Sequence, residues 1–246
     1  MDAIFLDTNS IRNPNVHSFF GNSEKYQRIS QLVQVVIPSI VIEEIKRQKK
    51  KHLLSQFDKF KNNYFTEFLG CNTGESLKKH IDKKIEDLYK NAQDEISYIE
   101  EDLKPEGKLE IIKELAIKNI PPFETVSDKG FKDSYIYLTV LQYVERASDD
   151  VFIITNDSRL QQAFDENKNV KVLSSPEEYF NYRKEYFKED YFIGRMQERF
   201  EDDSISRKSI LNVELTEDDD WQISIEVNGE QHEILVDFIS KEIIQD

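Results

Sequence analysis

Four acidic residues stand where an apolar stretch ends or an expected helix begins: Asp7, Glu44, Asp133 and Asp157. Asp7 directly follows the apolar residues 3–6, and Asp157 comes two residues after the run 151–155. A carboxylate at the end of a buried strand is costly unless water or a cation meets it. Carboxylates gathered in one place raise one another's pKa unless a bound cation reverses the local charge. The pattern therefore indicates a cation site.

The elements that would position these residues alternate between strands and helices. Buried strands are expected over residues 3–6, 33–38, 151–155 and 170–173. Helices are expected over residues 24–33, from the N-cap residue Ser39 onward, and over 131–147 and 158–166. This alternation predicts an α/β fold with a parallel sheet. Ligands of such sheets bind beyond the carboxyl ends of the strands, and all four carboxylates are expected there.

Oxygen ligands alone select hard ions, so the expected cofactor is Mg²⁺ or Mn²⁺. The histidines pair with no cysteine at zinc-ligand spacing, and the sequence has no phosphate-binding loop and no GxGxxG motif. Two ions about 4 Å apart could activate a water and stabilise the departing oxygen of a phosphodiester. Asp7 and Asp133 are the predicted central ligands, Glu44 a ligand of one ion, and Asp157 a ligand or water-orienting group.

Motifs in these four places resemble those of the PIN-domain nucleases. They read LDTN at 6–9, PSIVIEEI at 38–45, FKDSYI at 131–136 and TND at 155–157. The resemblance implies a three-layer α/β/α fold and a Mg²⁺- or Mn²⁺-dependent phosphodiesterase that usually acts on RNA. It also implies products with a 5′-phosphate and a 3′-hydroxyl. It assigns Glu44 to the acidic position of the second motif, with Glu43 as the alternative.

Polar and basic residues near these motifs are expected to support the site. The side chains predicted to fix the carboxylates by hydrogen bonds are Thr8, Asn9, Glu43, Thr155 and Asn156. The basic stretch KRQKKKH, residues 46–52, continues the helix of Glu44. The residues predicted to contact nucleic-acid phosphates are Lys46, Arg47, Lys50, Lys51, Lys129 and Lys132. A solvated helix face is the alternative interpretation of the lysine run.

The net charge of −15 does not exclude a nucleic-acid substrate, because it is unevenly distributed. Residues 201–246 contain 14 acidic and 3 basic residues, so the rest of the chain is much closer to neutral. No apolar run approaches the ~20 residues of a membrane helix, and residues 1–9 do not resemble a signal peptide. The single Cys71 fits a reducing compartment. We expect a cytoplasmic protein without a membrane partner.

The chain is expected to contain a nuclease domain over residues 1–200 and an acidic β-meander over 205–246, with an Asn-Gly hairpin turn at 228–229. A charged, strand-poor helical insertion is expected over about 52–125. Its apolar residues recur at coiled-coil spacing: Ile81, Ile85, Leu88, Ala92, Ile96, Ile99 and Leu103. This seam predicts packing within the chain, with a homodimer interface as the alternative.

The leading functional hypothesis is a metal-dependent endoribonuclease of a toxin or defence type. A DNA or flap-type nuclease is the first alternative, because a helical arch could thread a single strand. A non-catalytic PIN-like adaptor is the second. The insertion or the acidic tail would then bind a protein partner, and the tail is also a candidate inhibitor that covers the basic stretch.

Overall fold

The computed structural model describes residues 1–246 except 14, 16, 22, 62–73, 126–128 and 246. The chain forms two compact units, Met1–Ser174 and Ser175–Asp246, and each is described by itself. The tip of the predicted insertion, with Cys71, lies outside the described residues. No helix in the described part of the chain combines the length and the apolar character that a membrane crossing requires.

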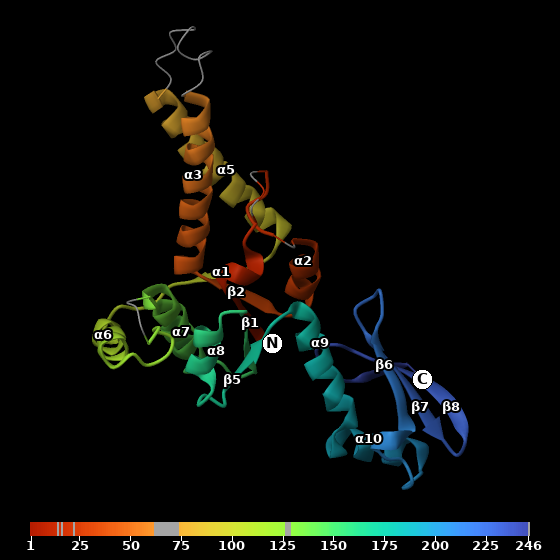
Figure 1. The fold of residues 1–246 in the computed structure, drawn as a ribbon. Helices are drawn as coiled ribbons and strands as arrows, with labels where there is room; N and C mark the ends of the chain where they lie inside the picture. Colours follow the sequence, from red (N-terminus) through yellow and green to blue (C-terminus); the bar gives the residue numbers. More distant parts are fainter. Residues whose placement is uncertain (14, 16, 22, 62–73, 126–128, 246) are drawn as a thin grey trace. The chain divides into compact units, whose positions relative to one another are not determined.

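A parallel sheet forms the centre of the first unit, with strand order β3-β2-β1-β4-β5 (Figure 1). The strands are β1 (Ala3–Leu6), β2 (Gln34–Pro38), β3 (Ile99–Glu101), β4 (Val151–Ile154) and β5 (Val170–Leu173). Strands β1 and β4 are buried along their whole length, as their apolar runs predict. Leu6 pairs with Ile154, so the residues that follow them lie side by side at the carboxyl end of the sheet.

Helices flank this sheet and complete the predicted α/β fold. They are α1 (Thr8–Ile11), α2 (Ser23–Leu32), α3 (Ser39–Lys61), α5 (Gly74–Glu95), α6 (Lys108–Lys118), α7 (Phe131–Val144) and α8 (Ser158–Phe164). Helix α2 packs against β2, α8 packs against β5, and α7 contacts α3, α6 and α8. The predicted parallel central sheet with flanking helices is therefore confirmed.

Helices α3 and α5 pack against each other and extend together away from the sheet (Figure 1). The seam of α5 is buried from Ile81 to Ala92, and the burial continues to Ile96 just after the helix. Exposed ion pairs join the two helices: Lys50 Nζ lies 2.6 Å from Asp82, and Lys46 Nζ lies 3.2 Å from Glu86. The seam therefore packs within the chain.

The prediction that the seam continues to Leu103 is wrong. Ile99 is 44% exposed in β3, a short edge strand parallel to β2 that the sequence did not predict. Leu103 is buried in a separate cluster with Ile112, Phe123 and Leu138. The apolar spacing of a helix and that of a short strand plus a loop coincide over a few residues, so periodicity alone misplaced this segment.

The second unit is a small antiparallel sheet with strand order β6-β7-β8-β9 and two preceding helices. Its elements are α9 (Pro176–Glu185), η1 (Tyr186–Lys188), α10 (Asp190–Phe200), η2 (Arg207–Ser209), β6 (Ile210–Leu215), β7 (Trp221–Val227), β8 (Glu230–Val236) and β9 (Ile243–Gln245). Asn228 and Gly229 both have positive φ and form the predicted turn between β7 and β8.

The predicted domain boundary at residues 200–205 is corrected to Ser174. The physical reason lies in the core of the second unit. The ring of Phe187 in η1 lies 5.5 Å from the ring of Trp221, and Phe192 in α10 lies 5.0 Å from Phe187. These buried aromatic contacts join η1 and α10 to the β-sheet, and α9 belongs to the same unit, so these helices fold with the acidic meander.

Candidate metal centre

Asp7 lies at the junction of β1 and α1, and its side chain is 3% exposed. Asp7 is the N-cap of α1, where its Oδ1 accepts a hydrogen bond of 2.6 Å from the Thr8 backbone amide. The other oxygen, Oδ2, accepts one of 2.9 Å from the Thr155 hydroxyl. Two strand ends thus fix the orientation of one buried carboxylate.

Asp157 follows β4 on the neighbouring strand and caps α8. Its Oδ1 accepts hydrogen bonds of 2.9 Å from the backbone amides of Arg159 and Leu160. Its own amide donates to the Thr155 hydroxyl oxygen at 3.1 Å. The Thr155 hydroxyl is therefore shared between the Asp7 carboxylate and the backbone of Asp157, and it links the two acidic residues.

Asp133 lies in the first turn of α7, which starts after Gly130. Gly130 has φ of +130°, and a Cβ there would lie 2.6 Å from the Phe123 Cα, so only glycine fits this start of the helix. Among the described residues, no hydrogen bond to the Asp133 carboxylate is found. Asp133 therefore presents a carboxylate that the described parts of the protein leave without a donor.

The electrostatics show that these aspartates are neighbours. Burial, followed by the negative charges of Asp157 and Asp7, raises the pKa of Asp133 to about 6, and Lys132 partly opposes this. Burial also raises the pKa of Asp7, and the charges of Asp157 and Glu44 add to that effect, although Thr155 and Thr8 oppose it. The site therefore concentrates negative charge that the protein itself does not fully compensate.

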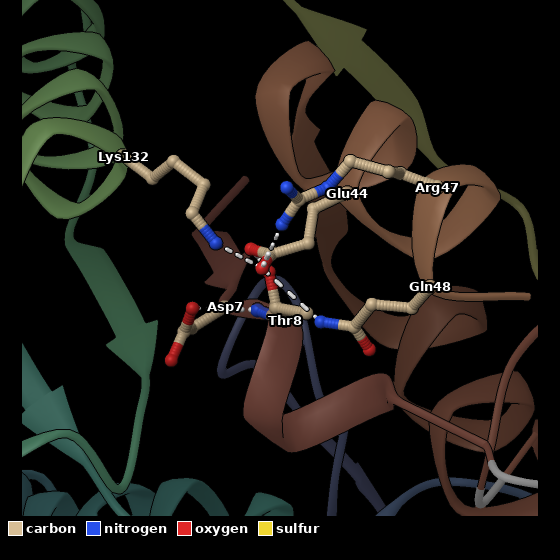
Figure 2. Close-up of polar contacts among 6 residues, drawn as sticks. All are labelled: Asp7, Thr8, Glu44, Arg47, Gln48 and Lys132. Carbon is tan, nitrogen blue, oxygen red and sulfur yellow. Dashed lines mark hydrogen bonds and ion pairs between the residues drawn. The ribbon is translucent and has the colours of Figure 1, made fainter. Parts of the chain in front are cut away.

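Glu44 in α3 is in a different situation, because donors surround it (Figure 2). Lys132 Nζ pairs directly with its Oε1, and Gln48 Nε2 donates to the same oxygen at 3.1 Å. The Thr8 hydroxyl donates to Oε2 at 3.0 Å, and Arg47 Nη2 lies 3.8 Å from Oε1. Burial tends to raise the pKa of Glu44, but Lys132, Thr8 and Gln48 together hold it below its usual value.

Comparison with protein families matches residues 4–160 to the PIN domain. The chain belongs to the PIN-domain family. PIN domains are generally metal-dependent nucleases, and the family typically depends on Mg²⁺ or Mn²⁺. Comparison with curated proteins and with solved structures found no match.

The four predicted carboxylates of the PIN-domain centre have different surroundings. Asp7, Asp133 and Asp157 influence one another's charge, whereas Glu44 is paired with Lys132. Within the described part of the chain, no set of three or more His, Cys, Asp or Glu side chains is already arranged to hold a metal ion. The donor set nevertheless fits a hard divalent cation, because it consists of carboxylates whose mutual repulsion a cation would relieve.

Two of the residues predicted to fix the carboxylates do so, and three do not. Thr8 and Thr155 donate to the site as described above. Glu43 is 68% exposed and pairs with Lys46 at 3.5 Å, so the structure brings Glu44 and not Glu43 to the centre. Asn9 is exposed, and Asn156 is exposed with its side-chain amide 3.5 Å from the Ser174 carbonyl oxygen. Neighbouring residues on a helix or a tight turn point in different directions, which explains the difference.

The basic stretch of the PIN domain is less available for phosphates than its composition indicates. Lys46 pairs with Glu43 and Glu86, and its ammonium lies 4.1 Å from the centroid of the Tyr89 ring. Lys50 pairs with Asp82. Both lysines therefore connect α3 to α5. Arg47 is 73% exposed and Lys51 is exposed, so these two positions of the stretch face solvent.

Sequence reasoning missed three contributions to the site. Gln48 follows Glu44 by one helical turn, and this i,i+4 spacing is the signal that could have found it. Lys49 is 7% exposed, and its ammonium donates to the carbonyl oxygens of Asn13 and Asn15 at 3.1 and 2.8 Å. Ser10 donates to the Asp7 carbonyl at 2.6 Å. Nothing in the sequence signals that Lys49 anchors the segment after α1.

Proposed function

We propose that this PIN domain is a Mg²⁺- or Mn²⁺-dependent endoribonuclease. The observation that carries the proposal is the gathering of Asp7, Asp133 and Asp157 at one place, where burial and the neighbouring charges raise the pKa of Asp7 and of Asp133. Family membership supports a nuclease, and the exposed cations beside the centre support a phosphodiester substrate. RNA, the choice of metal and a toxin or defence role are our inferences, as is a cytoplasmic location.

Each residue of the centre has a defined task in this proposal. Asp7 and Asp133 would hold the ion, with Asp157 as a third ligand or as the acceptor that orients the attacking water. The bound ion would supply the charge that activates the water and stabilises the departing oxygen. Thr155 would keep the Asp7 carboxylate in its orientation, because it donates to Oδ2 at 2.9 Å.

Exposed cations near the centre supply the expected contacts to the substrate backbone. Arg47 lies beside Glu44 with most of its side chain in solvent. Lys129 is 79% exposed and precedes the helix of Asp133, although Glu124 lies 3.8 Å away. Lys51 continues the solvent-facing positions of α3. Arg47 is the strongest candidate, because its guanidinium can bind a phosphate with two hydrogen bonds.

Replacement of Arg47 by glutamine is expected to weaken RNA binding in a salt-dependent way. A lost phosphate contact lowers the slope of log affinity against log salt concentration by about 0.7 for a single strand. Fluorescence anisotropy of a labelled single-stranded RNA in EDTA, between about 50 and 200 mM salt, measures this slope. Lys113→Gln is the matched control, because it removes one charge from α6, which carries no residue of the centre. Equal slopes for the two variants would remove Arg47 from the substrate path.

A cleavage assay with matched oligonucleotides tests the proposed function. Single-stranded RNA and DNA of one sequence are incubated with the full chain and Mn²⁺ or Mg²⁺, and the ends of the products are analysed. We expect internal cleavage of RNA with 5′-phosphate ends, and no cleavage in EDTA. Faster cleavage of DNA, or of a flap substrate, would replace RNA as the substrate class. Absence of cleavage together with absence of Mn²⁺ binding at millimolar concentration would favour an adaptor that binds a protein partner.

A further inference from the structure

Lys132 and Glu44 form a charge pair inside the candidate metal centre, although 88 positions separate them in the sequence. Glu44 is 11% exposed at its side chain, and Lys132 is 42% exposed. Their contact joins α3 to the first turn of α7, the same turn that presents Asp133. The ammonium group thus reaches the centre from the residue directly before a proposed metal ligand.

Further donors contact both oxygens of the Glu44 carboxylate. Oε1 receives Lys132 and Gln48, and Oε2 receives the Thr8 hydroxyl. A carboxylate with three donors, one of them a cation, is already stabilised as an anion. To bind Glu44, a metal ion would have to compete with Lys132 and Gln48 at Oε1 or share Oε2 with the Thr8 hydroxyl.

The three aspartates of the centre differ from Glu44 in their hydrogen-bond partners. In Figure 2 the Asp7 carboxylate points away from Glu44, and Thr8 donates a hydrogen bond to each of them. Asp133 has no hydrogen-bond donor within the described residues, and Asp157 accepts only through Oδ1 from the described backbone. The centre therefore separates into Glu44, which is paired with a cation, and three aspartates for which the described residues form no ion pair.

We propose that the centre holds one divalent ion, at Asp7, Asp133 and Asp157, and that the Lys132 ammonium serves as the second cation by neutralising Glu44. Glu44 is then not a metal ligand but the anchor that positions Lys132 beside the reacting phosphate. This inference rests on the proposed function, because it assumes that the aspartates bind a metal ion. It replaces the arrangement of two ions that the sequence indicated.

Counting of bound Mn²⁺ tests this assignment. Electron paramagnetic resonance of the free ion gives the stoichiometry and affinity for the full chain, at about 0.2 M salt to screen the exposed charges. The Mn²⁺ bound by Asp133→Asn measures weak binding elsewhere in the protein, and this background is subtracted. We expect one ion in the wild type, without the coupled spectrum of two adjacent ions. In Glu44→Gln the affinity for that ion should stay within about threefold, because Glu44 does not contact it.

Removal of the cations around Glu44 should create a second site. In the double variant Lys132→Gln/Arg47→Gln the Glu44 carboxylate has lost both basic neighbours, so a second, weaker Mn²⁺ is expected to bind. Lys132→Arg retains the positive charge and should keep the stoichiometry at one. A double variant that still binds one ion would overturn the proposal.

Two further outcomes would also overturn it, and they separate its failure from that of the proposed function. Two ions in the wild type, or a loss above tenfold in Glu44→Gln, would make Glu44 a metal ligand and leave the nuclease assignment intact. Absence of any specific ion, with the wild type equal to Asp133→Asn, would contradict both the inference and the metal-dependent function.

Discussion

Asp133→Asn is expected to abolish metal-dependent cleavage and at the same time to stabilise the metal-free protein. The amide keeps the shape of the side chain but removes the charge that would bind the ion, so the cleavage rate should fall by at least about 1,000-fold, or about 4 kcal/mol. The same change removes a charge that burial, followed by repulsion from Asp157 and Asp7, disfavours; these effects raise the pKa of Asp133 to about 6. Discounted for partial exposure to water, this relief is worth about 1–2 kcal/mol of unfolding free energy near pH 7.

The measurement combines cleavage kinetics with urea unfolding in EDTA. Asp165→Asn is the matched control, because Asp165 is an exposed aspartate at the end of α8 in the same unit. The control should change both quantities little. An Asp133→Asn variant that cleaves RNA at the wild-type rate would exclude Asp133 from the centre, and a loss of stability would contradict its repulsive surroundings.

The stability of the metal-free protein is expected to depend on pH through Asp133. The pKa of Asp133 is about 6 in the folded protein against 3.8 for an aspartate side chain in water, so the folded state binds more protons between these values. This contribution to stability is therefore fully present below about pH 4 and is lost as the pH rises through about 6. The charged groups that face Asp133 are Asp7, Glu44, Asp157 and Lys132.

The difference between the wild type and Asp133→Asn isolates this effect, because carboxyl groups with lowered pKa, such as Glu44, change stability in the opposite direction. Urea unfolding in EDTA from pH 4 to 8 should show the variant gaining on the wild type as the pH rises. Mn²⁺ competes with the same proton, so its affinity should rise steeply up to about pH 6 and level off above it. A constant difference across this range would contradict the raised pKa of Asp133.

The parallel sheet could be predicted because its central strands are continuous apolar runs that flank the motifs. Strand β5 spans residues 170–173, as its sequence predicts. Strand β3 could not be predicted, because Ile99–Glu101 is a three-residue edge strand with two charged side chains inside a charged insertion. Its pairing with β2 is a tertiary effect that local sequence does not encode.

The acidic residues of the centre could be predicted because the topology of parallel strands collects them at one edge. The partner of Glu44 could not, because the sequence shows Lys132 only as a basic residue beside Asp133. The lysine run was likewise visible as charge, but its partners Asp82 and Glu86 are on α5, beyond the residues 62–73. Composition thus revealed which charges are present, while their pairing required the arrangement of α3, α5 and α7.

A crystal of the full chain grown with Mn²⁺ tests the central claim most directly. Anomalous scattering locates manganese independently of any assumption about its ligands. We predict one peak coordinated by the carboxylates of Asp7 and Asp133 at the carboxyl end of the sheet, next to Asp157. Absence of a peak there at millimolar Mn²⁺, or manganese bound only at acidic residues elsewhere in the chain, would contradict the claim that these aspartates share a divalent ion.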